Sequence, residues 1–267
     1  MRDLGVIEGG CLASREGKIV FAGNRADFER DVSLADDAVI LEGTDRVVVP
    51  GFVDAHTHLA FAGSRHEEFA LRLDGHSYEE IAARGGGILS TVRATRAAIP
   101  EELGESLLRR LDRMLLHGTT TCEAKSGYGL TLESELALLR LVDEAATAHP
   151  MTVLGTLLGA HALPPEYRGD RDGYVTLVAE RMIPAAAAAG FASFCDVFCE
   201  RSAFTVAEAR RIFAAGAAHG LAPRVHADQL SDFGAANLAA EIGATAADHL
   251  DHVGDDGIRA LAAAGVP

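Results

Sequence analysis

Apolar runs of strand length alternate with helical segments from residue 51 onward. The runs lie at 51–54, 119–123, 151–158, 194–198, 223–226 and 245–249. Strands that alternate with helices predict a parallel sheet whose crossover connections are right-handed. Six strand–helix units are visible in this sequence, whereas a closed (β/α)₈ barrel needs eight. The pattern leaves two architectures open: an open sheet of six strands, or a barrel that lacks its last units.

Three local signals define helices between these strands. Leucine and methionine recur at helical spacing over 101–117. Thr205 and Glu208 form a capping-box pattern, which predicts a helix beginning at this point. Pro184 lies within the apolar stretch 174–189, so we expect that helix to be kinked or broken.

Residues 1–50 have a different pattern. Short β-branched runs bounded by glycine, asparagine or aspartate lie at 17–23, 38–43 and 47–51. They predict hairpins and a small sheet, and no helix of useful length is expected. Fifty residues make a poor core alone, so this portion must pack on something else. We divide the chain into a small β portion, 1–50, and an α/β domain, 51–267.

Composition removes several classes of function. The 267 residues are 48% hydrophobic and 24% charged, as in ordinary soluble globular proteins. The net charge of −15 opposes binding to nucleic acid or to anionic lipid. No run of residues suits a membrane span or a signal peptide. The four cysteines have no CxxC pairing, so we expect reduced thiols in a cytoplasmic protein that binds a small molecule.

The first chemically informative motif is His56-Thr57-His58, directly after the first strand of the α/β domain. Residues i and i+2 of an extended chain point to the same side, so the two imidazoles can reach one ion. Such pairs also arise by chance or as half-buried histidines, and taken alone the motif divides evenly between these interpretations. Neutral imidazole binds zinc, iron, nickel or manganese, so the motif does not choose the metal.

Three further histidines, His161, His226 and His249, stand at the C-terminal ends of different predicted strands. Barrel enzymes place their active sites at that face. A single histidine there is more often structural, but three beside a His-X-His motif indicate a common site. The remaining histidines lie in loops or at helix ends and receive no role: His66, His76, His117, His149, His219 and His252.

Several longer segments resemble the imidazolonepropionases of the amidohydrolase superfamily over nearly the whole chain. They are PGFVDAHTHLAFAGSRHEEFALRL, ARGGGILSTVRATR, AKSGYGL, LGAHALPPEYRGD, FCDVFCE and HADQLSDFGAANLAAEIGATAADHLDH. The resemblance implies hydrolysis of the cyclic amide of 4-imidazolone-5-propanoate to N-formimino-L-glutamate in histidine breakdown. It also implies a (β/α)₈ barrel with a β-sandwich, one zinc or iron ion, and a homodimer when the protein is complete.

The resemblance assigns the metal ligands and the catalytic group. His56, His58 and His226 match the family's first three metal ligands. His249 matches the catalytic histidine beside the metal, where proton transfer takes place.

The resemblance also assigns the substrate-binding residues. Arg65 matches the arginine that binds the substrate carboxylate, a contact suited to a planar guanidinium. Tyr128 and His161 match substrate-binding residues. Gln229 stands where some members have glutamate, so it can hydrogen-bond the ring, but a proton-transfer role there is not expected.

Two other features have structural interpretations. Gly85-Gly86-Gly87 is not preceded directly by a strand or followed by Gly-Lys-Ser/Thr, so it predicts a turn at a helix start rather than a phosphate loop. Cys195 and Cys199 share a face of their strand, and we expect buried thiols rather than metal ligands.

The sequence departs from the family pattern in one respect. The family's metal site is completed by an aspartate of the eighth strand, in a DxNPG-like segment that this sequence lacks. We therefore expect a fragment or truncated product, poorly active and unstable compared with a version extended through the eighth strand. The alternatives are an inactive remnant that binds metal weakly, and another amidohydrolase such as a cyclic amidine deaminase.

Overall fold

A computed structural model describes residues 4–76, 80 and 86–267. The chain divides into two compact units, Met1–Pro50 and Gly51–Pro267. Each unit is described by itself.

From residue 4 onward, the first unit contains one antiparallel pair of strands, β1 (Gly10–Arg15) and β2 (Lys18–Asn24), followed by helix α1 (Arg25–Asp31). The strand expected at 17–23 is thus confirmed. The helix was not expected; it begins where the Asn24 side chain accepts a hydrogen bond from the Asp27 backbone N–H at 2.9 Å.

The strands expected at 38–43 and 47–51 are absent, so that part of the prediction is wrong. Val39, Leu41 and Val47 are exposed there, each by more than four-fifths. A β-branched run becomes a strand only when a second strand satisfies its backbone N–H and C=O groups. Among the described residues no strand pairs with these runs.

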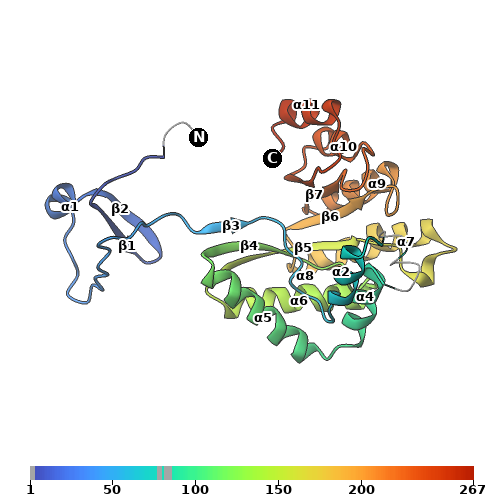
Figure 1. The fold of residues 1–267 in the computed structure, drawn as a ribbon, viewed down its shortest axis with the longest axis horizontal. Helices are drawn as coiled ribbons and strands as arrows, with labels where there is room; N and C mark the ends of the chain where they lie inside the picture. Colours follow the sequence, from blue (N-terminus) through green and yellow to red (C-terminus); the bar gives the residue numbers. More distant parts are fainter. Residues whose placement is uncertain (1–3, 77–79, 81–85) are drawn as a thin grey trace. The chain divides into compact units, whose positions relative to one another are not determined.

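Among its described residues, the second unit is built on six parallel strands in the order β3-β4-β5-β6-β7-β8, which form a half-barrel (Figure 1). Their bounds are β3 Phe52–Asp54, β4 Thr119–Lys125, β5 Thr152–Ala160, β6 Phe194–Cys199, β7 Ala222–Ala227 and β8 Ala246–His249. All six predicted strands are confirmed. β3 and β8 are the edges of the described sheet. In β8, the Ala247 N–H donates a hydrogen bond to the carbonyl of Pro267 at 3.0 Å.

Helices follow the strands and cover the outer face of the half-barrel; α5 and α6 lie along β4 and β5 (Figure 1). The helices are α2 His66–Leu73, α4 Ile88–Ala97, α5 Pro100–Leu116, α6 Leu132–Ala148, α7 Arg171–Leu177, α8 Ile183–Ala189, α9 Val206–Ala218, α10 Ala235–Glu241 and α11 Asp255–Ala264, with a 3₁₀ turn at Pro165–Tyr167. Thr205 caps α9 through the predicted capping box. The disturbance expected at Pro184 is confirmed: a π-helical turn, Val178–Met182, separates α7 from α8. None of the described helices is long and apolar enough to span a membrane.

Alternation along each strand separates an apolar face from a polar one. On β4, Cys122 and Ala124 are fully buried in the core beneath the helices, together with Leu107 of α5. The residues between and after them, Glu123 and Lys125, project to the opposite face, inside the half-barrel. The helices thus cover an ordinary hydrophobic core, and the inner face is left for chemistry.

Candidate active site

His56 and His58 lie just beyond the end of β3, in chain that still runs alongside β4. The Lys125 backbone N–H donates to the Thr57 carbonyl at 3.0 Å, and the Thr57 hydroxyl donates to the Glu123 carbonyl. With Thr57 held against β4, its two neighbours point together: the Nε2 atoms of His56 and His58 are 3.3 Å apart. The shared side expected from the i, i+2 spacing is confirmed.

His226 joins this pair from β7. Its Nε2 lies 3.3 Å from the Nε2 of His58, and its ring is almost fully buried. Its Nδ1 lies 2.9 Å from the Asp196 carboxylate of β6. The Nδ1 of His56 lies 2.9 Å from the Asp248 carboxylate of β8. A carboxylate at Nδ1 favours the tautomer that keeps the Nε2 lone pair free.

The other two predicted histidines border the same cluster. His161 follows β5 directly, and its ring stacks on that of His58 with centroids 5.1 Å apart. Its Nδ1 lies 3.0 Å from the Gly127 carbonyl, which can only accept, so Nδ1 donates and Nε2 keeps its lone pair. Burial, followed by the neighbouring His226, lowers the pKa of His161 to about 3. Burial also holds the pKa of His58 well below its usual range.

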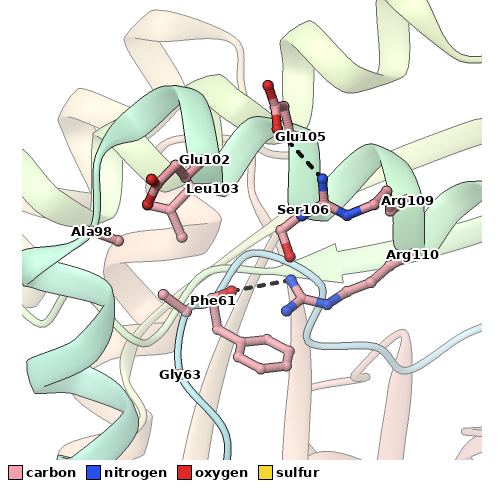
Figure 2. Close-up of a pocket in the computed structure, with 10 residues that line it drawn as sticks. Phe61, Gly63, Ala98, Glu102, Leu103, Glu105, Ser106, Arg109 and Arg110 are labelled. Atoms are coloured by element: carbon pink, nitrogen blue, oxygen red, sulfur yellow. Dashed lines mark hydrogen bonds and ion pairs between the residues drawn. The ribbon is translucent and has the colours of Figure 1, made fainter.

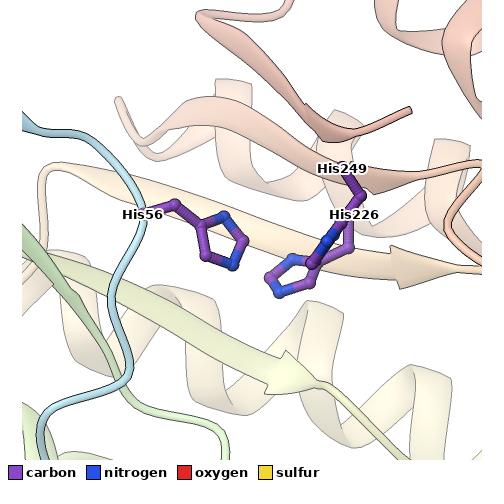
Figure 3. Close-up of side chains that lie close together, drawn as sticks. All are labelled: His56, His226 and His249. Atoms are coloured by element: carbon purple, nitrogen blue, oxygen red, sulfur yellow. The ribbon is translucent and has the colours of Figure 1, made fainter. Parts of the chain in front are cut away.

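His249, the last residue of β8, reaches the cluster through an unusual backbone conformation. Asp248 faces the inside of the half-barrel, so strict alternation would send the next side chain toward the helices. His249 instead has φ +74°, a region that non-glycine residues rarely adopt. Its ring lies with those of His56 and His226, at 4.9 and 5.1 Å between centroids (Figure 3). Burial lowers the pKa of His249 to about 4.

The donor set fits a metal ion. Two groups place one ligand atom of each member within 4.8 Å of the others: His56, His226 and His249; and His58, His161 and His226. Four tetrahedral nitrogens at about 2.05 Å from zinc would lie about 3.4 Å apart. The Nε2 of His58 is 3.3 Å from the Nε2 of both His56 and His226, which matches that spacing. The histidines are thus arranged as in a metal site typical of amidohydrolases.

A layer of charged side chains lies beneath the histidines, inside the half-barrel. Lys125 is fully buried, with its Nζ 2.6 Å from Glu123, 2.7 Å from Asp196 and 3.5 Å from Asp248. Arg224 lies 3.0 Å from Glu123 and 3.3 Å from Asp248. We call Glu123, Lys125, Asp196, Arg224 and Asp248 the charged layer.

Opposite charges favour the ionised forms of Lys125, Asp196 and Asp248. Burial opposes the charge of Lys125, but Asp196 and Glu123 outweigh it and raise the pKa of the ammonium. Burial likewise opposes the charge of Asp196, but His226 and Lys125 outweigh it, so the pKa of that carboxyl is lowered. The ionised carboxylates are therefore available to accept hydrogen bonds from the histidines above them.

Sequence reasoning did not identify the charged layer. Each member is a single charged residue inside a strand, and its partners come from other strands. The available signal was the alternation of side chains along a strand. Glu123 and Lys125, at i and i+2, share a face, as do Arg224 and His226. A charged residue two positions from a histidine in a buried strand indicates that both line the inside of the barrel.

Arg65 and Tyr128 line one cavity of about 370 Å³, together with Phe61, Gly63, Ser64, Thr91 and Arg110. Tyr128 links this cavity to the histidines, because its ring centroid is 5.8 Å from that of His58 and 5.3 Å from that of His161. Glu68 binds Arg65, with Nε and Nη2 each 2.7 Å from one carboxylate oxygen. Arg65 thus shares a cavity with Tyr128, and Tyr128 in turn lies against two histidines of the cluster.

The remaining predictions have mixed outcomes. Gln229 is half-buried three residues after His226 and makes no side-chain hydrogen bond within the described part of the chain. Gly87 caps α4 with φ +72°, as expected of a turn at a helix start, whereas Gly85 lies outside the described residues. Cys195 and Cys199 are free, buried thiols in the core, and burial raises the pKa of each to about 12.

Comparison with known sequences agrees with this geometry. A sequence model described as "Amidohydrolase family" matches residues 47–267. Imidazolonepropionase of Symbiobacterium thermophilum is 55% identical over 266 residues, which are 99% of this chain and 63% of that protein. Imidazolonepropionase of Shouchella clausii is 49% identical, over 100% of this chain and 60% of that protein. The chain therefore spans about three-fifths of the length of these relatives.

Comparison with solved structures shows the fold. A 5-methylcytosine deaminase from Klebsiella pneumoniae superposes with a TM-score of 0.66 at 17% identity, covering 96% of this chain and 61% of that one. Ochratoxinase from A. niger superposes with a TM-score of 0.55 at 17% identity, covering 96% of this chain and 59% of that one. At such identities the likeness extends to the fold alone.

Proposed function

The chain belongs to the amidohydrolase family, and on that premise we propose that it carries the active-site residues of an imidazolonepropionase. The proposed reaction is hydrolysis of the ring amide of 4-imidazolone-5-propanoate to N-formimino-L-glutamate. The observation that supports it most is the adjacency of two features: a histidine cluster suited to a metal, and a cavity containing Arg65. Tyr128 contacts both. This arrangement suits a small ring that bears a carboxylate.

In this proposal the substrate is held at its two ends. Arg65 binds the propanoate carboxylate, for which a planar guanidinium offers paired N–H donors. His161 is neutral and donates its Nδ1 proton to Gly127, so its Nε2 accepts a hydrogen bond from a ring N–H of the substrate. Gln229 follows the strand of His226 and provides an amide for the ring.

Hydrolysis forms a C–O bond at the ring carbonyl carbon and breaks the C–N bond of the amide. The water loses a proton, and the departing ring nitrogen gains one. We assign this proton movement to His249, whose ring is neutral near pH 7 because its pKa is lowered to about 4. Its ring lies 4.9 Å from that of His56, at the edge of the metal-binding cluster.

His56, His58 and His226 would hold one zinc or iron ion. When bound, such an ion supplies Lewis-acid chemistry that polarises a carbonyl and makes water more acidic. Asp248 and Asp196 keep the Nε2 lone pairs of His56 and His226 available for it. We also propose that the complete protein is a homodimer, which sedimentation analysis of a full-length version would test.

Turnover tests the proposed function. The 267-residue chain, and a chimera that continues it with the C-terminal segment of the Symbiobacterium thermophilum relative, are supplied with zinc or iron and 4-imidazolone-5-propanoate. We expect N-formimino-L-glutamate from the chimera, loss of turnover in His226→Ala, a higher KM in Arg65→Ala and a lower kcat in His249→Ala. His219→Ala, outside the site, is the control. No product from the metal-loaded chimera would refute the proposal.

A further inference from the structure

Arg110 of α5 is a cation for which the described structure provides no anionic partner. Its Nη1 donates to two carbonyls, those of Leu59 at 2.5 Å and Phe61 at 3.1 Å. Its guanidinium carbon lies 3.8 Å from the centre of the Phe61 ring. Within the described part of the chain it makes no ion pair. Burial, followed by the neighbouring charge of Arg109, lowers the pKa of Arg110, so its surroundings do not offset its charge.

This cation lines the cavity that contains Arg65 and Tyr128, and it also lines the neighbouring cavity of about 420 Å³ shown in Figure 2. The stacking on Phe61 fixes the plane of the guanidinium, and its N–H groups point outward in that plane. Because the Leu59 and Phe61 carbonyls engage Nη1, the described hydrogen bonds leave Nη2 and Nε without an acceptor.

Arg65 differs from Arg110 in this respect. Both Nε and Nη2 of Arg65 are 2.7 Å from Glu68, which also accepts the Gly87 backbone N–H at 3.0 Å. An incoming carboxylate would have to share Arg65 with Glu68, whereas Arg110 has no competing carboxylate. A half-buried, uncompensated charge is unfavourable until an anion arrives.

We propose that Arg110 is a second carboxylate-binding residue, which holds the anionic end of the substrate in the cavity that it shares with Arg65 and Tyr128. This inference rests on the proposed function, since it takes the substrate to be a small ring with a carboxylate tail. The cavity's volume of about 370 Å³ lies within the usual range for small-molecule sites. Arg110 thereby selects for the negative charge of the tail, in addition to holding the 59–61 segment.

The test compares two probes that share the imidazole ring, 3-(imidazol-4-yl)propanoate and its uncharged amide. Affinities for the zinc-supplemented chain are measured by calorimetry. The unmodified protein should prefer the propanoate, and Arg110→Gln should weaken propanoate binding about tenfold while leaving the amide within about twofold. Glutamine retains a donor for the Leu59 and Phe61 carbonyls. Arg109→Gln is the matched control, because Arg109 is exposed, adjacent and paired with Glu105; it should change neither affinity.

Two variants separate charge recognition from support of the loop. Arg110→Lys keeps the charge and should retain most of the preference for propanoate, whereas a loop-supporting role would make lysine as damaging as glutamine. If Arg110→Gln leaves the ratio of the two affinities unchanged while Arg65→Gln abolishes it, Arg110 is not a carboxylate ligand. If the unmodified chain binds both probes equally, the proposed substrate class fails first, and the role of Arg110 fails with it.

Discussion

The histidine cluster and the charged layer beneath it lie on the same strands but follow different rules. The histidines stand at or just beyond the strand ends and bring their Nε2 atoms close together. The members of the charged layer stand within the strands and pair basic with acidic side chains: Lys125 and Arg224 lie among Glu123, Asp196 and Asp248. The difference indicates that the histidine cluster provides nitrogen lone pairs, whereas the charged layer orients the rings that carry them.

The largest expected effect comes from removing the central charge of the lower layer. Lys125→Met leaves Glu123 and Asp196 buried without their shared cation, which should cost about 3–5 kcal/mol of unfolding free energy. Urea denaturation measures this. The matched control is Lys18→Met, since Lys18 is exposed on β2 in the other unit. A loss below about 0.5 kcal/mol, within the scatter of surface substitutions, would show that the charged layer does not depend on Lys125.

The next effect concerns the link between the two layers. Asp196→Asn removes the carboxylate at the Nδ1 of His226. Loss of a hydrogen-bond partner of a metal ligand weakens metal binding about 10–100-fold, and here we expect the upper end, about 100-fold. Competition with a chelator measures the zinc Kd. Asp172→Asn, at an exposed carboxylate paired with Arg211, is the control. An unchanged zinc Kd in Asp196→Asn would show that zinc binding by the histidines does not depend on this contact with the charged layer.

A smaller effect is expected at the other link. Asp248 also lies 2.9 Å from its histidine, but it is less buried than Asp196, and water can replace part of its contact. Asp248→Asn should therefore weaken zinc binding only about tenfold, the lower end of the same range. The same chelator competition ranks the two variants. The reverse ranking would mean that burial does not set the strength of these contacts.

The smallest effect is on pH dependence in the metal-free protein. The pKa of His161 is lowered from 6.5 to about 3, so at intermediate pH the unfolded chain takes up a proton that the folded chain refuses. Stability is full above pH 6.5 and falls as the pH drops toward 3. One such group should cost about 1 kcal/mol between pH 6.5 and 5.5. Denaturation at both pH values should show a shallower dependence in His161→Gln than in the exposed control His219→Gln; identical dependence would contradict the assignment.

The sequence predicted those features that depend on residues close together in the chain. Apolar runs and helical spacing located all six strands of the sheet and the capped start of α9. The His56-Thr57-His58 motif was recognisable because its two rings are separated by one residue, so one local conformation brings them together. The histidines at strand ends followed from topology, because parallel strands bring their carboxyl ends to one edge.

What escaped prediction depends on partners distant in the chain. Asp196 meets Lys125 across 71 positions, and neither residue signals the other in the sequence. Residues 38–49 have strand-forming composition, yet no described strand pairs with them, so propensity alone did not decide their structure. His249 was expected at the site, but the positive φ that turns its ring toward the cluster was not.

Zinc binding tests most directly whether the histidines form one metal centre supported by the charged layer. Elemental analysis of the zinc-loaded chain should give one zinc per chain, and X-ray absorption should show nitrogen ligands at about 2.0–2.1 Å. In His56→Ala and in His226→Ala the zinc content should collapse. Zinc retained at full occupancy in both variants, or a coordination shell without imidazole nitrogen, would contradict the account.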